Sequence, residues 1–263
     1  MKEKTMKKLT GVIGFLVIML VFAIVPGTKA DAATLKKGNS EAISANLNGG
    51  GEFHTLKLTK DSWVKFTLVS NYKEDTRMSD GYVTIYKGSK RVSLQKAVSY
   101  YGNGSTDQWA AFALKKGTYR VHVQMAYKGF YDANYNVQPN VYKVRTSIAT
   151  KTDGGGNTKG KAVTLKNNKY KSGIVAVTET SKTKGDWYKF KLTKTRKVKL
   201  TFTGQGEGIG ISYQTSKIPI SYHNNVRSFF SGKAVKLPKG TYWFKITKSN
   251  SLYSGYYKVK IKY

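Results

Sequence analysis

The chain has 263 residues, of which 46 are lysine or arginine and only 14 are aspartate or glutamate, so its formal net charge is +32 at pH 7. It contains no cysteine, which excludes disulfides, a lipid anchor built on a cysteine, and the usual cysteine-containing zinc sites. The strong positive charge favours polyanions as partners.

The N-terminal residues have the pattern of a secretory signal peptide. Four lysines precede an apolar run at residues 12–25, and Ala30 and Ala32 supply the small residues of a cleavage site. An uncleaved membrane anchor is the alternative, but about 14 apolar residues are fewer than the roughly 20 that span a bilayer. We therefore predict a signal peptide over residues 1–32, cleavage after Ala32, a secreted or cell-wall location, and no transmembrane segment in the mature chain.

The clearest structural signal is an alternation of apolar residues and lysines between Gly185 and Gly204. Tyrosine, phenylalanine and leucine alternate with lysine at 188–192, and after a polar turn valine, leucine and phenylalanine alternate with lysine and threonine at 198–202. This period of two predicts strands with one buried and one solvent-facing side. Neither half of the chain shows sustained helical spacing of apolar residues, so we predict an all-β fold.

Three sequence landmarks occur twice, in the same order. KLTK occurs at 57–60 and 191–194, KGTY at 116–119 and 239–242, and each half closes on a tyrosine-rich strand, at 141–148 and 256–263. The repetition predicts two copies of one unit. The predicted boundaries are domain 1 at 33–150, a flexible glycine-rich linker at 151–160 and domain 2 at 161–263, with a long loop at 71–101 in the first copy.

The segment DWYKF at 186–190, the KGTY turn at 239–242 and the closing segment SGYYKVKI at 254–261 together resemble the bacterial pre-peptidase C-terminal domain. The resemblance covers most of 160–263 and is weaker over 35–148, where Glu-Phe replaces Asp-Trp. It implies two tandem jelly-roll-like β-sandwiches. It also implies an accessory module of an exported protein, which in some members of that family attaches to collagen or polysaccharide and in some binds calcium.

The sequence shows no recognised catalytic pattern. The histidines, His54, His122 and His223, do not have the spacing of HExxH, and no GxSxG segment is present. A Ser/His/Asp triad is recognised by geometry and stays open. We predict that the protein is not an enzyme and has no cofactor.

The acidic residues also give no strong sign of a site. Glu74, Asp75 and Asp80 lie in a polar stretch, where we interpret them as solvated turn residues and not as paired catalytic carboxylates. The acids of the second half are scattered along the sequence: Asp153, Glu179, Asp186 and Glu207. A calcium site needs converging oxygen ligands, so we predict no metal site and interpret Asp186 as a residue that orders the entry of its strand.

Strand parity places lysines and aromatic rings of the second half on solvent-facing positions. These candidate ligand-binding residues are Lys189, Lys191, Lys197, Lys199, Lys258, Lys260, Lys262, Trp187, Trp243 and Tyr256. If the final strand pairs near the first two strands of domain 2, they share one surface, where ammonium groups attract polyanions and flat rings stack on sugars or bases. In the alternative interpretation, the lysines only solvate strands and the rings cover a sheet edge.

The sequence thus favours a secreted, non-catalytic bacterial protein that attaches to an anionic cell-wall or extracellular-matrix polymer, such as teichoic acid or polysaccharide. Because lysine acts as a point charge, binding is expected to be salt-sensitive. Nucleic acid is expected to bind only non-specifically, since no nucleic-acid motif is present. The alternative is a module that docks on collagen-like or peptidase partners through tyrosine-rich segments at 100–101, 127–135 and 213–222.

Overall fold

The computed structural model describes residues 32–39, 43–44, 51–70, 79–100, 109–125, 129–131, 137–139, 141–179, 185–213 and 234–263. Residues 32–263 form one compact unit. Every regular element of the described ranges is a β-strand, so the fold is all-β, as the alternating pattern predicts. These ranges contain no helix that is long and apolar enough to cross a membrane. The predicted signal peptide lies outside the described residues, apart from Ala32 at the start of the first strand.

The first half of the chain builds two main sheets and one short ribbon. The first sheet, called the β10 sheet, contains β1 (Ala32–Leu35), β4 (Glu52–Leu58), β6 (Ser79–Lys87), β7 (Lys90–Arg91), β8 (Lys96–Tyr100) and β10 (Gly117–Met125). The second, called the β5 sheet, contains β2 (Gly38–Asn39), β3 (Ile43–Ser44), β5 (Ser62–Ser70), β9 (Ala110–Leu114) and β13 (Val141–Thr150). The ribbon pairs β11 (Gly129–Tyr131) with β12 (Val137–Pro139).

The second half builds two four-stranded sheets. The β16 sheet contains β14 (Val163–Thr164), β16 (Asp186–Leu192), β18 (Ile209–Tyr213) and β20 (Gly240–Lys248). The β21 sheet contains β15 (Tyr170–Val175), β17 (Arg196–Gly206), β19 (Val235–Leu237) and β21 (Gly255–Lys262).

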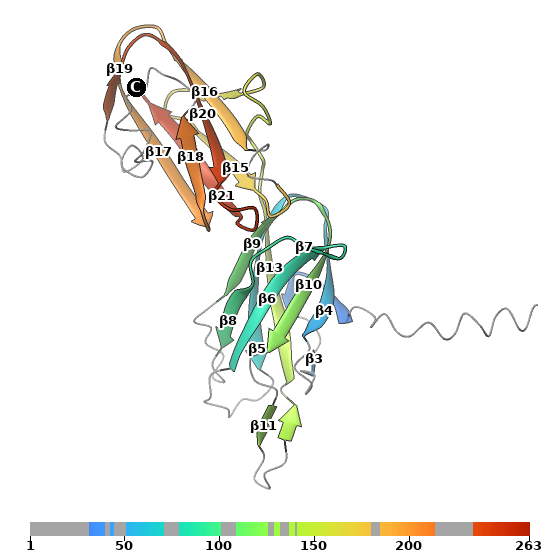
Figure 1. The fold of residues 1–263 in the computed structure, drawn as a ribbon. Helices are drawn as coiled ribbons and strands as arrows, with labels where there is room; N and C mark the ends of the chain where they lie inside the picture. The colour runs from blue at the N-terminus through green and yellow to red at the C-terminus, as the bar shows by residue number, and fades with distance from the viewer. Residues whose placement is uncertain are drawn as a thin grey trace, which may run out of the picture. The chain divides into compact units, whose positions relative to one another are not determined.

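The strand order is the same in the two halves. The path β1-β4-β10-β6 of the β10 sheet corresponds to β14-β16-β20-β18, and the first pair is parallel in both. The path β2-β13-β5-β9 of the β5 sheet corresponds to β15-β21-β17-β19. Figure 1 shows β4, β10 and β6 side by side in one half and β16, β20 and β18 side by side in the other. Two copies of one unit would have this arrangement.

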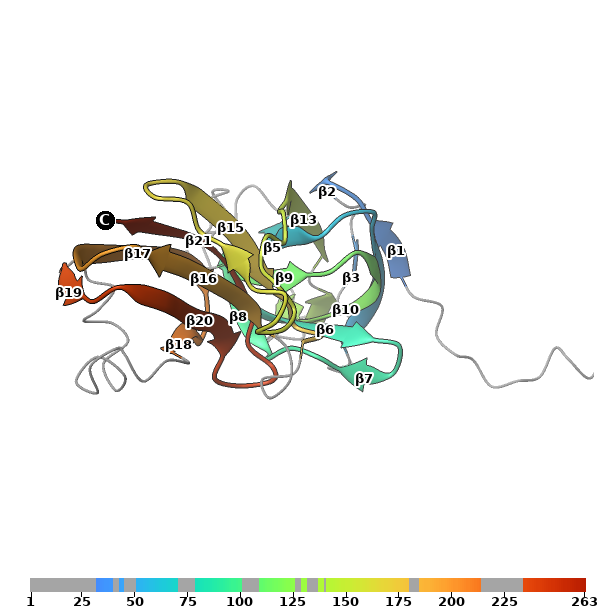
Figure 2. The same cartoon turned by 90° about the horizontal axis from the view of Figure 1, so that it is seen from above.

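Each half is a β-sandwich, because its two sheets share one hydrophobic core. In the second half, the core includes Tyr188 and Phe190 from the β16 sheet and Val259 from the β21 sheet. Figure 2 shows β15 and β21 along one side of this half and β18 and β20 along the other. The first half has a separate core around Phe66, and Val177 from the second half packs into it. The jelly-roll topology stays a prediction.

The repeated KGTY turn is fastened by a tyrosine hydroxyl in both halves. The hydroxyl of Tyr119 donates to the carbonyl of Lys115 at 2.9 Å, and the hydroxyl of Tyr242 donates to the carbonyl of Pro238 at 2.7 Å. Both side chains are buried, and a buried hydroxyl without a partner is costly. The two tyrosines therefore fasten the turns β9–β10 and β19–β20, each of which connects one sheet of a sandwich to the other, in the same way.

The predicted loop at 71–101 contains regular structure. Residues 79–100 include β6, β7 and β8, so the prediction of a loop is wrong for this part. The strand β6 pairs with β10 on one side and with β8 on the other. These long-range partners, which the local sequence does not reveal, stabilise the strand. The remaining residues of the predicted loop lie outside the described ranges.

The predicted linker at 151–160 is tied to both halves. The backbone N–H of Lys151 donates to the carbonyl of Asp61 at 2.8 Å, and that of Gly154 donates to the carbonyl of Ser172 at 3.0 Å. Gly155 passes so close to Asp186 that a Cβ atom would overlap its side chain. The glycines of this segment thus permit close packing, and the linker is not the free spacer that its composition predicts.

Candidate functional site

The outer face of the β21 sheet carries a row of lysines. On β21, Lys258 and Lys262 are exposed and Lys260 is half-buried, and they alternate with buried residues such as Val259. The neighbouring β17 contributes Lys199, which is also exposed. The predicted parity of these strands is therefore correct.

Like charges face one another across these strands. Lys199 of β17 stands directly opposite Lys262 of β21, and Lys197 of β17 stands opposite Lys236 of β19. Like charges at directly opposite positions destabilise a sheet. The four strands contain no aspartate or glutamate that would offset the repulsion. An anionic ligand on this face would relieve it.

The other predicted binding residues lie on a different face. Trp187, Lys189 and Lys191 belong to β16, and Trp243 belongs to β20, so they occupy the β16 sheet. A single shared surface requires the final strand to pair near both β16 and β17, but β21 pairs with β15 and β17. The prediction of one surface is wrong because the turn at 193–195 carries the chain from one sheet of the sandwich to the other.

On the β16 sheet, tryptophans and lysines alternate across the strands. Trp187 is opposite Lys245, and Lys189 is opposite Trp243. The Lys245 ammonium lies 5.9 Å from the Trp187 ring, and the Lys159 ammonium lies 5.4 Å from the Trp243 ring. Both rings are half-buried. Here the lysines and rings cover a sheet face, which agrees with the alternative interpretation of these residues.

A hollow of about 540 Å³ lies on the β21 sheet. Its lining includes Tyr170, Ser172, Thr203, Gln205, Tyr256 and Lys258. Tyr170 is 50% exposed, and the Lys260 ammonium lies 4.6 Å from its ring centroid. The hollow therefore combines aromatic rings with hydroxyl, amide and ammonium groups, and none of the described residues that line it is acidic.

The edge of β9 that does not pair with β5 contacts the second sandwich. The N–H of Ala113 donates to the hydroxyl of Ser254 at 3.1 Å, and its carbonyl accepts from the N–H of Val177 at 3.0 Å. An uncovered edge strand would leave such groups open to another chain. An apolar cluster lies beside these bonds and contains Trp63, Ala111, Ala113, Ile174 and the half-buried Tyr256. The second sandwich thus covers an edge of the first.

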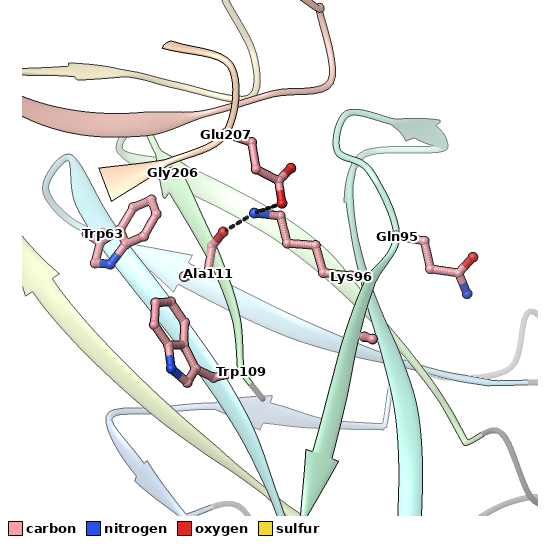
Figure 3. Close-up of a pocket in the computed structure, with 8 residues that line it drawn as sticks. Trp63, Gln95, Lys96, Trp109, Ala111, Gly206 and Glu207 are labelled. Carbon is pink, nitrogen blue, oxygen red and sulfur yellow. Dashed lines mark hydrogen bonds and ion pairs between the residues drawn. The ribbon is translucent and has the colours of Figure 1, made fainter. Parts of the chain in front are cut away.

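A second hollow, of about 560 Å³, lies at this junction. Trp63 and Trp109 line it, and Trp109 is 44% exposed. Figure 3 shows both indole rings on one side and the Lys96 ammonium between Glu207 and Ala111. That ammonium lies 3.4 Å from the Glu207 carboxylate and donates to the Ala111 carbonyl at 2.8 Å. Burial lowers the pKa of Lys96, and Glu207 opposes this effect.

An ion cluster fastens the same junction. The Lys115 ammonium pairs with Asp61 at 3.3 Å, with Asp153, and with Glu179 at 3.2 Å. Burial disfavours the charged ammonium, but the carboxylates outweigh burial and raise the pKa of Lys115 above its usual range. Burial also raises the pKa of Glu179, and Lys115 opposes that rise. The cluster holds groups from the first half, the linker and the second half together.

Asp186 is buried beside this cluster. Its carboxylate accepts a hydrogen bond from the Tyr257 hydroxyl, which lies 2.9 Å from the Tyr188 hydroxyl. Burial, helped by the charge of Asp153, raises the pKa of Asp186 to about 8. The prediction that the acids of the second half are scattered is wrong for Asp153, Glu179 and Asp186, because the linker and the loop after β15 bring them together at the start of β16.

The two histidines that the structure describes, His54 and His122, lie in structural positions. His54 of β4 is buried. His122 of β10 is half-buried, and its ring centroid lies 4.6 Å from that of Phe53. Burial lowers the pKa of His122. His223 lies outside the described residues.

The first-half acids and the tyrosine-rich segments are only partly described. Asp80 belongs to β6 and not to a polar loop, whereas Glu74 and Asp75 lie outside the described residues. Most of the tyrosine-rich segments at 100–101, 127–135 and 213–222 also lie outside them. Within the described ranges, no group of three or more acidic or histidine side chains is arranged to hold a metal ion.

The junction hollow was not among the sequence predictions. The sequence signal for this hollow is a difference between the two copies. When the two KLTK segments are aligned, Trp63 in the first copy occupies the position that Lys197 occupies in the second. A tryptophan at an outward position indicates that the position is covered. Trp63 is only 8% exposed, and the second sandwich covers it.

No protein-family model matches the chain, and no curated protein matches it in sequence. Among solved structures, a match to tripeptidyl peptidase 2 has 10% identity and a TM-score of 0.30, and it covers 87% of this chain. This chain spans 24% of the length of that peptidase. A match to PNGase F, a glycosylasparaginase from Flavobacterium meningosepticum, has 10% identity and a TM-score of 0.27, and covers 85% of this chain and 96% of that one. Similarity this low carries no argument about function.

Proposed function

We propose that the protein is a secreted, non-catalytic binding protein that attaches to an anionic polymer of the cell wall or extracellular matrix, such as teichoic acid or an acidic polysaccharide. The outer face of the β21 sheet binds the polymer. One observation carries this proposal: lysine stands opposite lysine at Lys199–Lys262 and Lys197–Lys236, on strands that contain no carboxylate.

The strand geometry suits a repeating anion. Side chains on one face of a strand recur every second residue, so Lys258, Lys260 and Lys262 extend from backbone positions about 7 Å apart. A polymer with one acidic group per unit meets several of them at once, and the weak individual contacts act together. Because lysine is a point charge, this surface selects for charge and spacing, and salt weakens the attraction.

The test compares two triple charge reversals that change the net charge equally. The first variant carries Lys258→Glu, Lys260→Glu and Lys262→Glu on the β21 sheet. The matched control carries Lys189→Glu, Lys191→Glu and Lys245→Glu on the β16 sheet. Each protein is titrated against purified cell walls, with and without teichoic acid, at low and high salt.

The first variant should bind about tenfold more weakly or worse, since each exposed ion pair contributes up to about 1 kcal/mol. The control should retain most of the affinity. Equal losses in both variants would mean that only net charge matters and would contradict a specific face. Binding that high salt leaves unchanged would instead favour docking of a protein partner through aromatic residues.

A further inference from the structure

The two hollows are neighbours. The hollow on the β21 sheet is lined by Tyr256, and the junction hollow by Trp63. The centroids of these two rings lie 5.3 Å apart, edge to face, so the ring pair is a shared wall. Along β17, Gln205 lines the first hollow and the next residue, Gly206, lines the second. The two hollows therefore adjoin one another over the same strand.

The spacing between the hollows is fixed. The backbone of Ala113 is hydrogen-bonded to Ser254 and Val177 across the junction, and Lys115 pairs with carboxylates of both sandwiches. A ligand that bridges the hollows therefore does not have to order two freely moving domains. Preorganisation of this kind lowers the entropic cost of binding.

Both hollows offer the same combination of groups. Each has an exposed ring with an ammonium group close to it: Lys260 lies 4.6 Å from Tyr170, and Lys65 lies 4.4 Å from Trp109. Flat rings with one apolar face and polar surroundings suit the apolar face of a sugar. Each of these ammonium groups lies over one face of its ring and suits a carboxylate on a sugar bound to that ring.

The lining of both hollows contains one carboxylate among the described residues, that of Glu207. The Glu207 carboxylate already forms an ion pair with the Lys96 ammonium at 3.4 Å. Around the first hollow, Thr203 and Gln205 supply hydroxyl and amide groups that can bond to sugar hydroxyls. A polyol phosphate chain has no ring faces to use the tyrosine and tryptophan, so the chemistry favours an acidic glycan over such a chain.

We infer that the two hollows form one track that holds a single acidic glycan chain across the junction of the sandwiches, with one sugar against Tyr170 and another against Trp109. This inference rests on the proposed function and specifies its ligand. The Trp63–Tyr256 pair lies between the two sugar positions. The glycan therefore contacts both copies of the repeated unit.

The test measures binding of short and long oligogalacturonates, and of polyglycerol phosphate, to the protein by calorimetry. Tyr170→Leu and Trp109→Leu keep an apolar side chain and remove the flat ring. Tyr82→Leu is the matched control, because Tyr82 is a 37% exposed ring on β6 in the β10 sheet. Thermal unfolding of each variant verifies the fold.

The wild type should bind the long oligomer more tightly than the short one. Tyr170→Leu and Trp109→Leu should each lower the affinity for the long oligomer about tenfold, to the level of the short one, and Tyr82→Leu should leave it unchanged. If only one of the two substitutions lowers the affinity for the long oligomer, the inference of a single track is wrong.

If polyglycerol phosphate binds as tightly as the glycan and neither ring matters, the glycan inference is wrong while the proposed function stands. The triple reversal at Lys258, Lys260 and Lys262 separates these cases. It should weaken every polymer if the proposed function holds. If it weakens none, the proposed function fails as well.

Discussion

Lys115 and Glu179 form an ion pair of 3.2 Å that joins a turn of the first sandwich to a loop of the second. Asp61 and Asp153 pair with the same ammonium group. One lysine is therefore the shared cation of three carboxylates at the point where the two sandwiches meet. We therefore expect the junction to depend on the positive charge of Lys115.

Replacing Lys115 by methionine should destabilise the protein. The change keeps the length of the side chain but leaves carboxylates close together without a cation, and breaking a partly buried network of this kind costs about 2–3 kcal/mol. Urea unfolding measures the loss. Lys116→Met is the control, because Lys116 is exposed and should tolerate the change. Equal stability of the two variants would show that the cluster does not hold the junction.

The contribution of Asp186 to stability should fall as the pH rises from about 4 to about 8, whereas the lowered pKa of His122 acts in the opposite direction. The pKa of Asp186 is about 8 in the folded protein and about 4 in an unfolded chain. Between these values the folded state holds a proton that the unfolded state has lost, so the free energy of unfolding decreases with pH. The raised pKa of Glu179 acts in the same direction.

Asp186→Asn should reduce this pH dependence, because asparagine does not titrate and still accepts a hydrogen bond from Tyr257. The measurement is the free energy of unfolding of both proteins between pH 4 and pH 8. Relative to that of the wild type, the free energy of unfolding of the variant should rise most at the upper end of that range. A parallel pH dependence of the two proteins would contradict the raised pKa.

Tyr119→Phe and Tyr242→Phe should each lower the free energy of unfolding by about 1 kcal/mol or more. Each change removes a hydroxyl that donates to a carbonyl four residues earlier, and the carbonyl is left without that donor. Thermal unfolding measures the loss. Tyr82→Phe serves as a control, since the Tyr82 ring is exposed and its hydroxyl can reach water. A loss at only one of the two turns would mean that the turns are not equivalent.

The strands of the second half are largely predictable from the sequence. Alternation at 188–192 fixes which side chains of β16 are buried, because one face of a strand meets the core and the other meets water. The KGTY repeat similarly indicates corresponding turns in the two halves. The pairing of strands is less predictable, since nothing in the local pattern shows that β21 pairs with β17 and not with β16.

The candidate site is only half predictable for the same reason. The row on β21 follows from alternation, but the two hollows are made by residues far apart in the sequence, such as Trp109 and Glu207. The acid cluster was also missed, because Asp153 and Asp186 meet only after the linker folds against the second sandwich. Such contacts depend on how whole sheets pack.

The repulsion between Lys199 and Lys262 gives a final prediction. Replacing Lys262 by threonine removes one of two like charges that stand opposite each other on adjacent strands. Relief of a cross-strand like-charge pair should leave stability unchanged or raise it by a few tenths of a kcal/mol. Because the same lysine belongs to the proposed binding surface, affinity for the anionic polymer should fall about threefold. Urea unfolding and polymer titration on the same sample measure both effects. A variant that loses stability and keeps full affinity would show that Lys262 supports the sheet and not the ligand.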